Sequence, residues 1–115
     1  MYGSSDPAFR GDVSKYNPEE FLVASISSCH MLWYLQLCST HKITVLNYDD
    51  VAKGVMKEKP DGSGQFEKVV LQPQIRIKEA DQKSLAVELH KEAHAKCFIA
   101  NSVNFDIFCE PIVKA

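Results

Sequence analysis

Two of the four cysteines in this chain of 115 residues stand where a thiol could carry out redox chemistry. Cys29 lies in the middle of a long apolar stretch, between Ser28 and His30, so hydroxyl and imidazole groups crowd its sulfur. Cys97 stands where a later helix is expected to end, and a side chain at such a junction can move. A sulfenic acid on one thiol condenses with a second thiol that can approach it, so Cys97 is suited to a resolving role.

The other two cysteines favour a structural interpretation. Cysteine is among the residue types most often buried. Cys38 faces another side of the helix from Cys29, and Cys109 alternates within an expected strand. A cysteine hydrolase built on Cys29 and His30 is excluded, because adjacent helical residues point about 100° apart and do not face each other.

A metal site is the weaker alternative for the later helix. His90 and His94 are one helical turn apart, and Cys97 follows three residues on, so the three could share one helix face. Histidine and cysteine are common zinc ligands. Such histidine pairs often arise by chance and the sequence marks no fourth ligand, so we expect no metal here.

A long helix over residues 17–40 must position Cys29. Asn17 is a favourable N-cap, Pro18 follows at the first helical position, and Glu20 stands three residues after the cap, as in a capping box. The segment is apolar on nearly all sides, and such a helix must be covered on most of them. A chain of this length has little with which to cover it, so we expect a partner subunit.

Composition limits the class of protein. The net charge is −2, and no basic block is present, which argues against nucleic acid as a partner. Polar residues interrupt the apolar helix, and neither a basic flank nor a signal-peptide pattern accompanies it, so we expect no membrane insertion. Without a secretory signal, a cysteine pair is more plausibly catalytic than structural, and we expect a cytoplasmic protein.

The rest of the chain predicts a single α+β domain over residues 1–115, with a long central helix and a second helix packed against antiparallel strands. Residues 65–78 alternate apolar and polar side chains, and Pro73 within them suggests an edge position or a bulge. Asp81 is a plausible N-cap for the second helix. The expected segments are an N-terminal loop (1–16), the central helix (17–40), a β-hairpin turning at 60–64 (43–78), the second helix (81–96) and a C-terminal strand (104–113).

Two stretches closely resemble the OsmC/Ohr family of osmotically inducible and organic hydroperoxide resistance proteins. These are NPEEFLVASISSCHMLWYL and, some seventy residues later, CFIANSVNF. They share an Asn-Pro-Glu helix start, a cysteine ten residues after the first Glu, and a second cysteine that opens a turn before the final strand. The resemblance covers about residue 5 to the end, and is closest to an OsmC-like subgroup with a shortened N-terminus.

The resemblance implies a fold, an assembly and a chemistry. Family members are intertwined homodimers with the long helices at the centre, and are thiol peroxidases that use neither metal nor flavin. By resemblance, Cys29 is the peroxidatic cysteine that reduces an organic hydroperoxide, and Cys97 resolves its sulfenic acid as a disulfide. A dithiol reductant then restores both thiols, and the role is defence against oxidative stress. Glu19 matches the family's active-site acid.

Two features of this sequence qualify that expectation. Glu19 and Cys29 are separated by about 15 Å along a straight helix, so either the helix breaks or Glu19 serves the Cys29 of the other chain, and we favour the second. Neither Arg10 nor Arg76 matches the family's active-site arginine. A thiol buried among apolar groups with no cationic neighbour has a raised pKa, and we expect this of Cys29.

The alternative from another class of function is a non-catalytic OsmC-like module. Such a module would bind a small apolar ligand at the dimer cleft or sense redox state. A peroxidase needs both Cys29 and Cys97, whereas a binding module tolerates replacement of Cys97 by serine.

Overall fold

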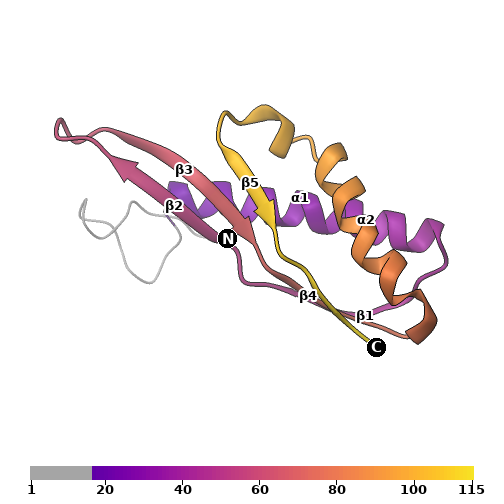
Figure 1. Ribbon diagram of the computed structural model, residues 1–115. Coiled ribbons are helices and arrows are strands. Elements are labelled where there is room, and N and C mark those ends of the chain that lie inside the picture. The colour runs from indigo at the N-terminus through magenta and orange to yellow at the C-terminus, as the bar shows by residue number, and fades with distance from the viewer. Residues whose placement is uncertain (1–16) are drawn as a thin grey trace.

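One long helix runs along this fold and contacts both sheets (Figure 1). The computed structural model describes residues 17–115. Helix α1 (Pro18–Thr40) is one unbroken helix, and α2 (Lys83–Lys96) crosses it. The remaining described elements are two 3-10 turns and six strands: η2 (Ala80–Gln82), η3 (Ala100–Ser102), β1 (Val45–Asp50), β2 (Lys53–Glu58), β3 (Gly64–Leu71), β4 (Pro73–Ile77), β5 (Asp106–Cys109) and β6 (Ile112–Lys114).

The start of α1 is fixed by the capping box that its sequence predicts. The Asn17 side chain accepts a hydrogen bond from the Glu20 backbone N–H at 2.8 Å, and the Glu20 carboxylate accepts one from the Asn17 N–H at 3.3 Å. Pro18 occupies the first turn, where a missing N–H leaves no bond unmade. The helix then continues without a break past Cys29.

The strands form two three-stranded sheets, ordered β1-β4-β6 and β2-β3-β5. The expected hairpin over 43–78 is divided into four strands, and the expected C-terminal strand into two, so that each long segment contributes to both sheets. The β1–β4 and β2–β3 pairs are antiparallel, but β3–β5 and β4–β6 are parallel. The expectation of purely antiparallel strands is therefore wrong for the C-terminal strands, which return to the sheets only after the α2 crossover.

Pro73 lies where the chain passes from one sheet to the other. It is the first residue of β4, which is the central strand of its sheet, so the predicted edge position is wrong. A proline is tolerated at the first residue of a strand because no ladder donor is needed there. The adjacent Gln72 N–H donates instead to the Asp50 carboxylate at 2.8 Å, and Ser27 of α1 donates to the same carboxylate.

Two separate apolar cores meet along α1. Ile26 packs with the β2-β3-β5 sheet, beside Val69 and Leu71. Tyr34 and Leu37 pack further along with α2 and the β1-β4-β6 sheet. Cys29 and His30 therefore occupy the turn of α1 that lies between the two cores.

Helix α2 is preceded by a 3-10 turn that the sequence did not predict. Asp81 lies inside η2, and Gln82 occupies the N-cap position without a side-chain capping bond, so the expected Asp81 cap is wrong. The C-terminal cap is Cys97, whose N–H reaches the His94 carbonyl at 3.4 Å. Helix α2 therefore ends at Lys96, immediately before Cys97, as the sequence predicted.

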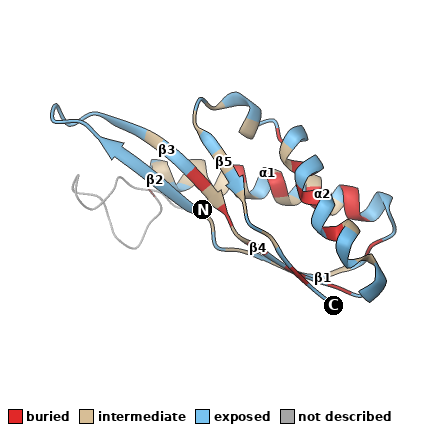
Figure 2. Ribbon diagram, in the orientation of Figure 1, coloured by how far each residue is buried: buried red, intermediate tan, exposed pale blue. Residues whose placement is uncertain are grey.

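Large parts of α1 and β2 are exposed to solvent in the single chain (Figure 2). Every residue of β2 is exposed, and Leu32 on α1 is 63% exposed. The fold is elongated, with extents of 52 × 28 × 19 Å and a radius of gyration of 16.0 Å, against about 13 Å for a compact chain of 100 residues.

Helix α1 is long and apolar enough to cross a membrane, by length and composition alone. The core helices of soluble proteins also pass this test.

Candidate active site

Cys29 and Cys97 come together although they belong to different helices. Cys29 projects from the middle of α1, and Cys97 caps α2 and is 1% exposed. The Cys97 thiol donates a hydrogen bond to the Cys29 sulfur. All four cysteines are free thiols, so this pair is in its reduced form. The two residues chosen from the sequence thus face each other within one chain.

The pKa of Cys29 is lowered, contrary to the expectation of a raised value. Burial raises it, but hydrogen bonds from the Cys97 thiol and from the backbone N–H groups of Ile99 and Phe98 outweigh that effect. Donors aimed at the sulfur stabilise the thiolate in the way that a cation would. The turn after α2 therefore supplies hydrogen-bond donors that favour the Cys29 thiolate.

The pKa of Cys97 moves the opposite way, to about 11. Burial is the largest cause, and donation to Cys29 adds to it because that bond exists only while Cys97 keeps its proton. The Ala100 N–H donates weakly to the Cys97 sulfur at 3.5 Å. The pair is thus asymmetric, with the nucleophilic thiolate favoured on Cys29 and the protonated thiol on Cys97.

Apolar and aromatic side chains surround the entrance to the pair. Trp33 lies one turn after Cys29 on α1, and its ring meets Phe98 edge-on at 6.2 Å between centroids. Phe98, the residue after Cys97, is 72% exposed. The Lys96 ammonium stands 5.7 Å from the Trp33 ring centroid. A substrate that reaches Cys29 from this side meets an apolar wall.

Glu19 does not reach Cys29 within one chain. Both residues belong to the unbroken helix α1, so about 15 Å of helical rise separates them. Glu19 instead lines a cavity of about 630 Å³ beside α1, with Glu20, Asp49 and Asp50. Of the two arrangements considered from the sequence, a break in the helix is excluded, and Glu19 of another chain remains.

The two arginines differ in what the structure shows of them. Arg76 is exposed on β4, in the β1-β4-β6 sheet. The hydrogen bonds to Cys29 come from Cys97 and from the backbone, not from Arg76. Arg10 lies outside the described residues, as does the expected N-terminal loop.

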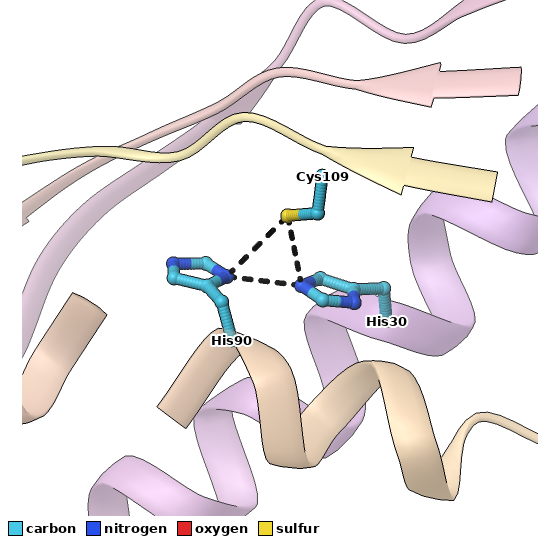
Figure 3. A group of neighbouring side chains, drawn as sticks. All are labelled: His30, His90 and Cys109. Carbon is cyan, nitrogen blue, oxygen red and sulfur yellow. Dashed lines mark hydrogen bonds between the residues drawn. The ribbon is translucent and has the colours of Figure 1, made fainter. Parts of the chain in front are cut away.

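The metal set weighed from the sequence is not assembled. His90 turns into the core, where it meets His30 of α1 and Cys109 of β5 (Figure 3). Cys97 instead faces Cys29. His30 and Cys109 are the residues that the sequence interpretation missed as partners. His30 was weighed only against its neighbour Cys29, and no periodicity links a helix residue to a strand so far along the chain. Cys38, as expected, is buried in the core.

Comparison with known families gives one clear match. Residues 11–110 match the family described as OsmC-like protein. No curated protein matches the sequence.

Solved structures with the same fold are numerous. An OsmC-like protein of unknown function from Vibrio cholerae is 33% identical, with a TM-score of 0.86 over 96% of this chain and 75% of that one. An organic hydroperoxide resistance protein from Elizabethkingia anophelis, with thiocyanate bound, is 21% identical, with a TM-score of 0.69 over 95% and 76%. An organic hydroperoxide resistance protein OsmC from Legionella pneumophila is 18% identical, with a TM-score of 0.67 over 97% and 79%.

Proposed function

This chain belongs to the OsmC-like protein family, and we propose that it is a thiol-dependent peroxidase that reduces organic hydroperoxides. One observation carries the proposal: the Cys97 thiol donates to Cys29, which lowers the pKa of Cys29 and raises that of Cys97. A peroxidatic cysteine must be a thiolate at neutral pH, and its resolving partner must be within reach. The lowered pKa of Cys29 favours its thiolate, and Cys97 lies within reach of it in the same chain.

The reaction follows from that asymmetry. The Cys29 thiolate attacks the terminal peroxide oxygen, the O–O bond breaks, and the organic oxygen leaves as an alkoxide that takes up a proton as the alcohol. Cys29 is then a sulfenic acid. The Cys97 sulfur attacks it, water leaves, and a Cys29–Cys97 disulfide remains. A dithiol reductant reduces that disulfide by exchange and restores both thiols.

The substrate class follows from the wall beside Cys29. Trp33 and the exposed Phe98 present aromatic surface next to the reactive sulfur. Hydrogen peroxide has no group to contact such a surface, whereas the alkyl or aryl part of an organic hydroperoxide gains by covering it. We therefore place organic hydroperoxides ahead of hydrogen peroxide as substrates.

The protein is proposed to act as a homodimer in the cytoplasm. The open faces of α1 and β2 call for a second copy, since together they leave large apolar side chains such as Leu32 and Met56 in solvent. In the dimer, Glu19 of one chain is placed to order the active site of the other. The resemblance to the family supports this role, and the unbroken α1 requires it if Glu19 acts at all.

Turnover with two cysteine variants tests the proposal. With cumene hydroperoxide and an excess of a small dithiol, the unmodified protein should consume peroxide in many turnovers, and Cys29→Ser should consume none. In the absence of dithiol, Cys97→Ser should reduce one equivalent of peroxide and then retain a sulfenic acid that dimedone traps. If the unmodified protein consumes no peroxide, the proposal fails in favour of the alternative, a non-catalytic module that binds an apolar ligand.

A further inference from the structure

Three side chains from three elements converge in the core away from the cysteine pair. His30 comes from α1, His90 from α2 and Cys109 from the end of β5, and Figure 3 shows them pointing at one another. His30 Nε2 and His90 Nδ1 are 2.9 Å apart, and Cys109 Sγ lies 3.7 Å from the first and 3.9 Å from the second. The peroxidase chemistry proposed above uses none of these atoms.

As a polar cluster without a ligand, this group is poorly satisfied. His30 and His90 are 1% and 2% exposed, so both rings are almost fully buried. Their outer nitrogens, His30 Nδ1 and His90 Nε2, have no hydrogen-bond partner among residues 17–115. Only one inner nitrogen can donate to the other, and the Cys109 thiol has a single proton to donate. Three potential metal-ligand atoms thus face one another in a buried site, and hydrogen bonds among them satisfy it only in part.

We propose that His30, His90 and Cys109 bind a zinc ion. The point equidistant from His30 Nε2, His90 Nδ1 and Cys109 Sγ lies about 2.1 Å from each atom. Usual zinc distances are about 2.0–2.1 Å to nitrogen and about 2.3 Å to sulfur, so an ion fits between the three atoms. Two imidazoles and a thiolate are ligands that zinc prefers, and three protein ligands leave a fourth position open.

The environment suits a cation with that ligand set. No neighbour holds either outer nitrogen, so each ring can carry its proton there and leave the inner nitrogen free. The Asp50 carboxylate interacts electrostatically with both His30 and Cys109, and its negative charge favours a cation bound between them.

An ion also has a way in. His90 and Cys109 line a surface cavity of about 300 Å³ together with His94 and Lys91. A water from this cavity can take the fourth position. On binding, Cys109 loses its proton to solvent and becomes the thiolate ligand.

Cobalt substitution tests the site in the full chain. Reduced protein, stripped with a chelator, is titrated with Co²⁺, whose tetrahedral complexes show visible d–d bands and, with a thiolate ligand, a charge-transfer band in the near ultraviolet. The Cys29→Ser/Cys97→Ser double variant serves as the background, so any thiolate band reports Cys109 or Cys38. One equivalent per chain, displaced by one equivalent of Zn²⁺, is the expected result.

Matched variants on that background make the test specific. Cys109→Ser should lose the charge-transfer band and weaken Zn²⁺ binding at least tenfold, whereas Cys38→Ser and the exposed-histidine variant His41→Gln should change neither. Zn²⁺ should also raise Tm in the background protein and not in Cys109→Ser. The proposal is overturned if the double variant binds no cobalt, or if Cys109→Ser binds it unchanged. Because the background lacks Cys29 and Cys97, neither outcome depends on peroxidase activity.

Discussion

The Cys97 thiol, at the end of α2, donates to the Cys29 sulfur in the middle of α1. Around Cys29, the backbone N–H groups of Phe98 and Ile99 complete the set of donors. The resolving cysteine and the two residues after it therefore also activate the peroxidatic one. Removing Cys97 should affect both the disulfide step and the reactivity of Cys29 before any oxidation.

The pH dependence of Cys29 alkylation tests that activation. Only the thiolate reacts, so the rate with iodoacetamide rises with pH and reaches half its maximum at the pKa. We expect this midpoint below the ordinary thiol value for Cys29 and near pH 11 for Cys97. Peptide mass spectrometry of each alkylated site separates the two.

Two replacements of Cys97 provide the control. Cys97→Ala removes the donor, so the Cys29 midpoint should move to higher pH. Cys97→Ser keeps a hydroxyl that can donate, so its midpoint should stay closer to that of the unmodified protein. Equal midpoints in the alanine variant and the unmodified protein would contradict activation by Cys97.

Mixing two inactive variants tests whether Glu19 acts across the dimer. Glu19→Gln and Cys29→Ser homodimers should each have little activity. A mixed dimer joins the intact Cys29 of one chain to the intact Glu19 of the other, so it regains one site of two. Random re-assembly of equal amounts makes half of the dimers mixed, so about a quarter of the unmodified activity should return.

The mixing experiment has a clear opposite outcome. If Glu19 served its own chain, each mixed dimer would carry one site without Cys29 and one without Glu19. Activity would then stay at the level of the separate variants. Size-exclusion chromatography of each homodimer beforehand shows whether two copies associate at all.

Two tyrosines with buried hydroxyl groups predict opposite effects on stability. The Tyr34 hydroxyl donates to the Ala86 carbonyl at 2.8 Å, whereas the buried Tyr48 hydroxyl has no partner in the part of the chain that the structure describes. Tyr34→Phe should lower the free energy of unfolding by about 0.5–1.5 kcal/mol, because it removes a buried hydrogen bond. Tyr48→Phe should leave it unchanged or raise it, because it removes an unsatisfied hydroxyl.

Urea denaturation of the three proteins at one concentration measures both effects. The tyrosine rings pack together at 6.0 Å between centroids, so either substitution leaves the same aromatic contact in place. The difference between the two variants therefore reports the hydroxyl groups alone. A larger loss for Tyr48→Phe than for Tyr34→Phe would contradict the hydrogen bonding described here.

Local signals in the sequence predicted the parts of the fold that local interactions determine. The capping box at Asn17 set the start of α1, and the Gly62 turn, where φ is +89°, separated β2 from β3. The same signals did not reveal that Gln72 and Pro73 divide one alternating segment between two sheets. That division depends on Asp50, which binds the Gln72 N–H from another strand.

The candidate site shows the same limit. Cys29 and Cys97, each with a distinctive local setting in the sequence, lie together in the structure, and their catalytic role stays a prediction. The pKa of Cys29 was predicted in the wrong direction, since the groups that lower it are the Cys97 thiol and the backbone N–H groups of Ile99 and Phe98, and no local pattern links that distant segment to Cys29. The meeting of His30, His90 and Cys109 likewise arises from the crossing of α1, α2 and β5, a tertiary arrangement without a sequence period.

The most direct measurement is a single turnover with one equivalent of cumene hydroperoxide. Free thiols are counted in the reduced protein before and after the addition, the intact mass is recorded, and the disulfide is located by peptide mapping. The account predicts rapid loss of two thiols, a mass lower by two hydrogens, and a disulfide between Cys29 and Cys97. Thiols that stay reduced for hours at neutral pH, or a disulfide between other cysteines, would contradict it.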